Sequence, residues 1–345
     1  KKITKLTVNY IKIKFGSMTN SILLKLPNSL TINNKLFTKI DKTAAGSYGT
    51  VLFYKSTDNS YGYALKIMFT NDITKINSKI LTELNSTLSI QNTKCKKFIN
   101  TDILTPDIFP NLGNKYNKNK YVFETDYYDE YNNKNKCYLG IILMPMGDGD
   151  LYNDMLLTID INKKIDIFRS ILIQLRCILR TENLVYPDIK LEQVLFKKCN
   201  NNIRILIGDL GGLQKFDDYP INTAGPDGTY INNYNIKSKQ LSLFPIAVLW
   251  NDIFVYNKFE SNFKVLYTTF DIKSYLNNKP NFNESMNKYL YDNSNNSRIK
   301  QQRQIILKWL QLDFTDPKLT GTDTKVKNFL MSEMTSLIDI IDSNK

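Results

Sequence analysis

The stretch from residue 186 to residue 211 holds the side chains of this chain that are best suited to chemistry. Asp188 and Lys190 occupy a short polar turn, and Gln193 follows three residues later. A second acid, Asp209, comes after an apolar run and lies in a glycine-flanked turn. Two carboxylates and an amide can together orient a hydroxyl group and hold Mg²⁺ against the phosphates of ATP. The segment therefore predicts a phosphoryl-transfer site.

Two short strands are expected to position these groups. Residues 194–196 and residues 203–207 form apolar runs of strand type, and a basic, Asn-rich turn separates them. An antiparallel hairpin returns the chain to the end from which it started. We therefore predict that Gln193 and Asp209 lie close together at one end of this hairpin.

These residues resemble the protein-kinase family, whose pattern is H-R-D-L-x-x-x-N followed by D-F-G. The resemblance implies that Asp188 is the catalytic residue that accepts the proton of the substrate hydroxyl, and that Lys190 steadies the transferring charge. It also implies that Gln193 and Asp209 bind the metal ion, and it assigns Leu195 to the nucleotide site.

Four positions depart from the family pattern. Tyr186 replaces His, Pro187 replaces Arg, Gln193 replaces Asn, and Leu210 replaces Phe. Because Pro187 cannot bind a phosphate group, we expect no switching by phosphorylation of the activation loop. Tyr186 and Leu210 are expected to stack in an apolar column.

A glycine-containing loop is predicted upstream, between two strands. Residues 37–42, 51–55 and 61–69 have strand patterns. Glycine between the first two strands lets the backbone approach phosphate groups without a Cβ clash. The loop resembles the kinase glycine-rich loop with its first glycine replaced by alanine. The resemblance implies that the nucleotide-binding residues of this loop are Ala44, Gly46, Ser47, Tyr48, Gly49 and Val51.

A lysine on the third strand is predicted to bind the α- and β-phosphates of a nucleotide. Ala64 and Lys66 match the V-A-I-K strand of the kinase family. A buried cation needs an anionic partner, because an unpaired buried charge is costly. Residues 73–90 have helical spacing of apolar residues, and Glu83 is the only acid among them. We therefore expect an ion pair between Lys66 and Glu83.

The apolar run at residues 138–144, followed by a break rich in proline and glycine, resembles the hinge that joins the two kinase lobes. The resemblance implies that Leu143 is the gatekeeper residue, and that Met144 to Met146 offer backbone groups to adenine. Asp150 would open the next helix near the ribose. An ordinary turn with a helix N-cap explains the same acidic and glycine residues.

The resemblance implies an α+β, bilobal protein-kinase-like fold. We expect a small antiparallel β-sheet lobe with helix C at residues 37–144, and a larger, mainly α-helical lobe at residues 145–345. A polar insertion at about residues 92–136 is expected to form solvated loops around one or two strands. Helices of the large lobe are predicted at residues 161–180, 241–256, 301–312 and 326–341.

The 345 residues carry a net charge of +13, and the excess is concentrated near the start of the chain. Residues 1–36 hold seven lysines and no acid. We interpret this segment as extra strands packed on the small lobe. The alternative is a basic patch for an acidic or virion partner. Nucleic-acid binding is not favoured, because the segment lacks interleaved aromatic residues and a nucleic-acid motif.

Other residue types restrict the function and the compartment. The four cysteines contain no C-x-x-C pair, which argues against disulfide scaffolds and zinc sites. The absence of histidine leaves a carboxylate such as Asp188 as the candidate general base. No apolar run is long enough to span a membrane, and no signal peptide is visible. We therefore expect an intracellular, cytoplasmic protein without membrane contact.

Together, these resemblances predict an ATP-dependent protein kinase that uses Mg²⁺ or Mn²⁺ and phosphorylates a protein of unknown identity. The Asp-x-Lys pattern favours serine/threonine specificity. One alternative is a pseudokinase-like scaffold or regulatory partner that binds nucleotide weakly or not at all. Another is a small-molecule phosphotransferase. The Asn, Lys, Ile and Tyr bias and the eroded motifs resemble kinases of large DNA viruses, which would place the protein in host cytoplasm or a virion.

Overall fold

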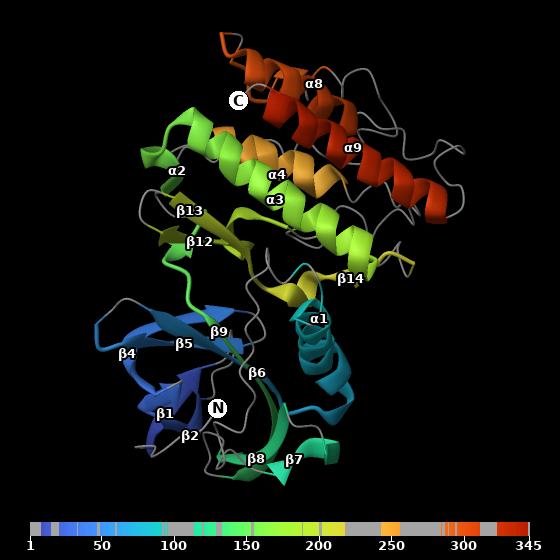
Figure 1. The fold of residues 1–345 in the computed structure, drawn as a ribbon. Helices are drawn as coiled ribbons and strands as arrows, with labels where there is room; N and C mark the ends of the chain where they lie inside the picture. Colours follow the sequence, from blue (N-terminus) through green and yellow to red (C-terminus); the bar gives the residue numbers. More distant parts are fainter. Residues whose placement is uncertain are drawn as a thin grey trace. The chain divides into compact units, whose positions relative to one another are not determined.

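The protein is a mixed α+β chain, seen here in a computed structural model (Figure 1). Two compact units are present: unit 1 comprises Lys1–Asn92 and Asn100–Gly147, and unit 2 comprises Thr93–Ile99 and Asp148–Lys345. The chain divides after residue 147 rather than after residue 144, and Thr93–Ile99, which were predicted in the small lobe, belong to unit 2. The residues that the structure describes are 8–14, 21–32, 34–46, 49–58, 61–91, 93, 95, 114–118, 121–128, 133–152, 155–187, 189–199, 202–217, 243–255, 284, 287–288, 290–293, 295–310 and 323–343.

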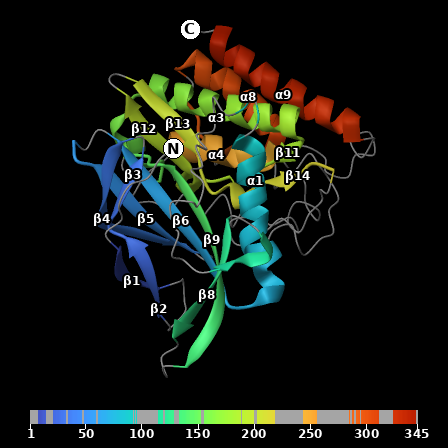
Figure 2. The same cartoon turned by 60° about the horizontal axis from the view of Figure 1, so that its bottom comes forward.

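Unit 1 is built on a curled antiparallel sheet, which Figure 2 shows together with its helix. Within the described residues the sheet has seven strands in the order β3-β4-β5-β6-β9-β8-β7. Its strands are β3 (Ser29–Ile32), β4 (Lys35–Gly46), β5 (Gly49–Ser56), β6 (Gly62–Thr70), β7 (Asn114–Lys115), β8 (Val122–Tyr128) and β9 (Lys134–Pro145). A separate hairpin comprises β1 (Val8–Lys14) and β2 (Ser21–Pro27), and β2 lies beside β8.

Most predicted strands of unit 1 are present. The three at residues 37–69 correspond to β4, β5 and β6, although β4 and β5 are longer than predicted and β6 is shifted by one residue. The polar insertion contains a strand where one was expected, β8, but its described parts also form β7 and the start of β9. Lys134–Lys136, predicted to be loop, pair with Asp126–Tyr128. Strand pairing therefore extends into a segment that reads as low-complexity loop.

Alternating side chains divide the sheet of unit 1 into two apolar faces. Residues of β5 alternate between buried and half-buried, whereas β6 is buried on both faces except at Lys66. One face forms a cluster around Leu65, Ile67 and Leu143. The other face forms a second cluster, in which Met68 and Ile142 of the sheet pack against Ile80 and Leu84. This second face carries the helical segment of unit 1.

The helical segment follows β6 and was predicted as one helix at residues 73–90. It is composite: a 3-10 turn η1 (Ile73–Lys75), a π-helical turn η2 (Asn77–Leu81) and the α-helix α1 (Thr82–Gln91). The side chain of Asp72 caps η1 by accepting a hydrogen bond from the Thr74 N–H at 2.9 Å. η2 lies against β6 and β9. Because α1 begins directly after this π turn, the turn determines which face of α1 is directed towards the sheet.

Five α-helices of unit 2 lie within the described part of the chain. They are α2 (Met155–Thr158), α3 (Ile161–Glu182), α4 (Leu243–Val255), α8 (Ser297–Leu310) and α9 (Asp323–Ser343), and α3 packs against both α4 and α9. Asp160 caps α3 by accepting from the Lys163 N–H, and Asn183 ends it in the left-handed conformation. No helix in these ranges is long and apolar enough to cross a membrane.

Two small antiparallel sheets complete unit 2. β10 (Gly149–Asp150), β12 (Val194–Cys199) and β13 (Asn202–Ile207) form one, and β11 (Leu184–Val185) and β14 (Gln214–Lys215) form the other. The predicted hairpin is therefore present as β12 and β13. Two 3-10 turns adjoin it, η6 (Leu191–Gln193) and η7 (Leu210–Gly212).

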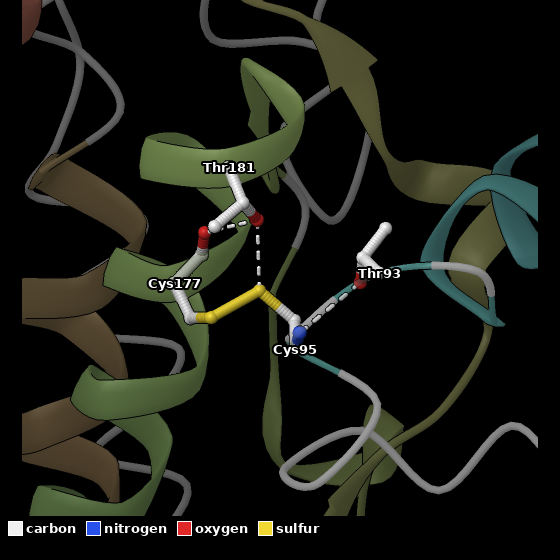
Figure 3. The surroundings of a disulfide bond; sticks show 4 residues. All are labelled: Thr93, Cys95, Cys177 and Thr181. Carbon is white, nitrogen blue, oxygen red and sulfur yellow. Dashed lines mark hydrogen bonds between the residues drawn. A yellow bond between two sulfur atoms is a disulfide. The ribbon is translucent and has the colours of Figure 1, made fainter.

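One pair of cysteines forms a disulfide that the sequence analysis did not predict. Cys95 and Cys177 are joined by a disulfide within unit 2, where Cys177 lies on α3 (Figure 3). The hydroxyl of Thr181, one turn further along α3, lies 3.0 Å from the Cys95 sulfur. Cys137 is a buried free thiol, and Cys199 is an exposed one. A separation of 82 residues gives no sequence signal for this pairing.

Candidate functional site

The predicted ion pair of unit 1 is present. Lys66 Nζ lies 2.6 Å from Glu83 Oε1, and the two side chains are only 16% and 10% exposed. Lys66 comes from β6 and Glu83 from the first turn of α1. At this burial a lysine without a counter-charge would be strongly destabilising. Glu83 therefore fixes the position of the ammonium group as well as neutralising it.

The strand register gathers several predicted nucleotide-binding residues on the face that carries Lys66. Val51 of β5 pairs directly with Lys66, and Ala44 of β4 pairs with Val51. Side chains of directly paired residues lie on the same face of an antiparallel sheet. Ala64 precedes Lys66 by two positions and therefore shares its face, as does Met144, the β9 partner of Ala64.

Leu143 lies on the opposite face of this sheet and is a correction to the sequence analysis. It pairs with Leu65, is 1% exposed, and belongs to the other apolar cluster. The prediction of Leu143 as the gatekeeper misjudged the strand phase by one residue, and a one-residue shift changes the face. Met144, rather than Leu143, lies on the face of the sheet that carries Ala64 and Lys66.

The predicted glycine-rich loop is a hairpin turn between β4 and β5. Gly46 and Gly49 form its last cross-strand pair, and Ser47 and Tyr48 lie outside the described residues. A Cβ atom at Gly49 would collide with the carbonyl oxygen of Ile67 on β6. Glycine is therefore required at position 49 by the close approach of β6, independently of any ligand.

The backbone of Met146 differs from the expectation that it offers groups to adenine. Its N–H donates a hydrogen bond to the Gly62 carbonyl oxygen at 2.9 Å. This bond extends the pairing of β6 with β9 by one step beyond Pro145. The Met146 N–H is therefore engaged within unit 1 and does not point to a ligand.

In unit 2 the β12–β13 hairpin brings Gln193 and Asp209 to one end, as predicted. Val194 pairs with Ile207 at that end, and the Gly208 N–H donates to the Gln193 carbonyl oxygen at 2.7 Å. Asp209 follows immediately with φ 50° and ψ 54°, a left-handed conformation that is uncommon outside glycine. It then begins the 3-10 turn η7.

The side chain of Gln193 closes the turn that contains Lys190. Its amide oxygen accepts a hydrogen bond from the Lys190 N–H at 3.1 Å, and Gln193 is 6% exposed. A carbonyl oxygen has two lone pairs, so one is engaged here. The fit to a metal ion is consequently uneven. The Asp209 carboxylate has the donor chemistry that Mg²⁺ prefers. The Gln193 amide oxygen, by contrast, already accepts a hydrogen bond from the backbone of its own turn.

No group of three or more His, Cys, Asp or Glu side chains that could hold a metal ion occurs among the described residues. The predicted set contains two carboxylates and one amide, and Asp188 lies outside the described residues. The neighbouring residues Pro187 and Ile189 are buried.

The predicted ribose and base residues of unit 2 are near neighbours of Asp209. Asp150 pairs with Leu195 across β10 and β12. The Leu195 side chain packs on Gly208, where an added Cβ atom would lie 3.3 Å from Leu195 Cδ1. Asp150 and Leu195 thus lie in one small sheet, and Asp209 lies two residues beyond the end of its strand β13.

Two residues of unit 2 with strong structural roles were missed by the sequence analysis. The hydroxyl of Tyr186 contacts the backbone on both sides of Asp209, whereas only apolar stacking was expected. Asp252 lies in α4 and is 7% exposed. Burial, with a smaller contribution from Glu192, raises the pKa of Asp252 well above its ordinary value. In the sequence, the available signal for this buried acid was a single acidic residue inside the apolar run that forms α4.

No protein-family model and no curated protein sequence matches this chain. The chemistry of the two groups of residues therefore has to be judged on their own geometry.

Proposed function

We propose that this chain is an ATP-dependent protein kinase that transfers the γ-phosphoryl group to a serine or threonine hydroxyl. In this proposal the fold is protein-kinase-like, with unit 1 as the small lobe and unit 2 as the large lobe. The proposal rests on the residue chemistry within each unit, since the kinase resemblance of the sequence is confined to short motifs.

The observation that carries the proposal is the Lys66–Glu83 ion pair. It joins a strand lysine to a helix acid 17 positions later, at 2.6 Å and largely shielded from water. A structural salt bridge rarely explains such a position, because burying an ion pair costs about as much as it returns. A held ammonium group beside Ala44, Val51 and Ala64 is instead suited to binding phosphate oxygens.

Unit 2 supplies the second line of support. Asp209 begins a turn at the end of β13, next to Gln193 and close to Leu195. A non-glycine residue in the left-handed conformation carries backbone strain, and such strained residues are concentrated at functional sites. The order of the residues along the chain, from the hairpin loop through Lys66 and Glu83 to Asp209, also matches the family order.

The proposed mechanism assigns one task to each group. Lys66, held by Glu83, binds the α- and β-phosphates beneath the Gly46–Gly49 turn. Asp188 orients the substrate hydroxyl and accepts its proton, and Lys190 stabilises the charge on the transferring group. A bound Mg²⁺ or Mn²⁺ ion would neutralise charge on the β- and γ-phosphate oxygens. Asp209 would be its principal protein ligand, with Gln193 contributing less.

A phosphotransfer assay with radiolabelled ATP tests the proposal. Basic and acidic generic proteins serve as acceptors, and wild type is compared with Asp209→Asn and Lys66→Met. We expect both variants to lose phosphotransfer by several orders of magnitude, because positioning and charge stabilisation supply this catalysis.

Two matched controls separate catalysis from folding. Lys75→Met removes a lysine from an exposed ion pair of unit 1 with Asp72, and Asp217→Asn removes an exposed acid that accepts from Asn183. Both controls should keep wild-type activity. A wild-type chain that binds a fluorescent ATP analogue but never transfers phosphate would overturn the proposal in favour of a pseudokinase-like scaffold.

A further inference from the structure

The Cys95–Cys177 disulfide lies close to the point where the chain first passes from unit 1 to unit 2. α1 ends at Gln91, and unit 2 begins with the short segment Thr93–Ile99. Two described contacts join Cys95 to α3: the covalent bond to Cys177, and the hydroxyl of Thr181, which lies 3.0 Å from the Cys95 sulfur (Figure 3). The disulfide therefore anchors the segment that directly follows α1.

The two cysteines of this bond differ in their access to solvent. Cys95 is 0% exposed, whereas Cys177 is half-buried. Thr181, one turn further along α3 than Cys177, is exposed. A small thiol in solution can therefore reach the bond more easily at Cys177. Because disulfide exchange begins with the attack of a thiolate on one of the two sulfur atoms, Cys177 is the cysteine that is attacked.

Cys95 is the better leaving group of the pair. The sequence around it is Lys-Cys-Lys-Lys at residues 94–97, so three lysines lie within two positions, against one arginine for Cys177. Positive charge nearby stabilises a thiolate. The Thr181 hydroxyl can also turn its hydrogen from the Cys177 carbonyl oxygen to a Cys95 thiolate. Burial and charge thus favour the same direction of attack.

We propose that the Cys95–Cys177 bond is a reversible switch operated by a low-molecular-weight thiol such as glutathione. A first glutathione thiolate attacks the Cys177 sulfur and forms a mixed disulfide, while Cys95 leaves as a thiolate and takes up a proton. A second thiolate attacks the glutathione sulfur of this mixed disulfide and releases Cys177, which is protonated in turn. The protein gains two thiols, and two glutathione molecules are oxidised to one glutathione disulfide.

Opening the bond releases the segment at Cys95 and, through it, the end of α1. In the oxidised chain this segment is held covalently, which restricts fraying of the last turn of α1. Glu83 belongs to the first turn of the same helix, so loss of order in α1 weakens its ion pair with Lys66. Reduction should therefore lower phosphotransfer. This last consequence rests on the proposed function, whereas the thiol exchange does not.

Reduction of the folded wild-type chain by glutathione tests the switch. The chain is incubated at a series of ratios of reduced to oxidised glutathione and then alkylated, and the cysteine peptides are quantified by mass spectrometry. We expect Cys95 and Cys177 to become alkylated together as the ratio rises, and to be protected again when oxidised glutathione is restored. A bond that stays closed in reduced glutathione, and opens only after denaturation, is structural and would overturn the proposal.

The direction of attack is tested by early quenching of the same reaction. The mixed disulfide should carry glutathione on Cys177 and the alkyl group on Cys95; glutathione on Cys95 would contradict the proposed direction. Thr181→Val should slow reduction several-fold, and Thr181→Ser should restore the wild-type rate. Cys199→Ser removes the exposed free thiol of the same unit, and as a control it should leave both the rate and the required glutathione ratio unchanged.

Amide hydrogen exchange and phosphotransfer measure the consequence of reduction. In the reduced chain we expect the amides of Ser89 and Ile90, at the end of α1, to exchange about tenfold faster, and Leu206 of β13 to exchange at an unchanged rate. If neither redox state transfers phosphate, the kinase proposal fails, while faster exchange at the end of α1 still supports the switch. Unchanged exchange there would overturn it regardless of activity.

Discussion

At the scale of single residues, the charged groups of unit 1 show why sequence could anticipate a pair that lies 17 positions apart. Lys66 interrupts an otherwise buried strand, so a counter-charge had to be present. Glu83 was the only acid in the following helix. The requirement for charge neutrality left a single choice, and the structure confirms the pairing.

The Lys66–Glu83 pair predicts a non-additive effect on stability. Glu83→Gln should cost about 3 kcal/mol of unfolding free energy, because it leaves the Lys66 ammonium buried without its partner. The double variant Lys66→Met with Glu83→Gln should recover most of this loss while staying inactive in phosphotransfer. Denaturant unfolding of the single and double variants measures this cycle. A loss in the double variant equal to the sum of the losses in Glu83→Gln and Lys66→Met would show that the pair does not act as a unit.

Asp252 predicts a dependence of stability on pH. Burial raises the pKa of Asp252, so the folded chain keeps a proton that the unfolded chain releases above about pH 4. Stability contributed by this group is therefore complete below that pH and is lost as the pH rises through the folded pKa. Asp252→Asn keeps a neutral side chain, and should be more stable than wild type at neutral pH.

The measurement is thermal unfolding of wild type and Asp252→Asn between about pH 4 and about pH 8. The difference between them should shrink towards the acidic end. Asp292→Asn, which removes an exposed acid of the same unit, is the control and should follow wild type. A constant difference across the range would mean that Asp252 is ionised in the folded chain.

At the scale of elements, α9 illustrates two kinds of contact with very different energies. Arg169 of α3 donates to both carboxylate oxygens of Asp342 at 2.6 Å. Both side chains are roughly one third exposed, so solvent screens much of their attraction. Leu337 of the same helix is fully buried. Apolar burial, rather than the ion pair, should therefore hold α9 in place.

Two alanine substitutions test this ranking. Leu337→Ala should lower the unfolding free energy by about 2–5 kcal/mol, because it opens a cavity in the core. Asp342→Ala should lower it by less than about 1 kcal/mol. Denaturant titration of both variants gives the comparison. A larger loss for Asp342→Ala would mean that the bidentate contact is far better shielded than its exposure implies.

The elements were also the most predictable level of this structure. Helices at residues 161–180, 301–312 and 326–341 correspond to α3, α8 and α9, with ends that differ by a few residues. Apolar periodicity located them because each buries one face. The composite nature of residues 73–91 was not predictable, since a π turn changes how the helix rotates without changing its apolar spacing.

Leu143 shows the limit of the same reasoning for strands. β9 is buried on both faces from Cys137 to Leu143. Continuous burial removes the alternation that would reveal the strand phase, so the face of each residue could not be read from the sequence. Only the pairing of β9 with β6 decides that Met144 shares a face with Lys66.

At the scale of the whole molecule, the Cys95–Cys177 disulfide is the feature that sequence spacing could not supply. In the chain-entropy account, closing a loop of this length contributes about 4 kcal/mol to stability. Thiol counting tests whether the bond is present. Burial, with a smaller contribution from Asp126, raises the pKa of Cys137 to about 12, so this thiol should resist alkylation in the folded chain.

We expect mass spectrometry after alkylation to find one modified cysteine in the native protein, the exposed Cys199. Denaturation without reductant should add Cys137, and denaturation with reductant should modify all four cysteines of the chain. Reductant should also lower the unfolding temperature. Four modified cysteines without reductant would show that Cys95 and Cys177 are not bonded.

The path of the backbone through the two units gives this disulfide a further consequence. Cys95 belongs to a short segment of unit 2, Thr93–Ile99, that lies in the sequence between the two parts of unit 1, Lys1–Asn92 and Asn100–Gly147. A protease cut or an engineered split after Gly147 would therefore leave Cys95 on the amino-terminal fragment and Cys177 on the carboxy-terminal one. The two fragments would migrate as a single species in a denaturing gel until a reducing agent separated them.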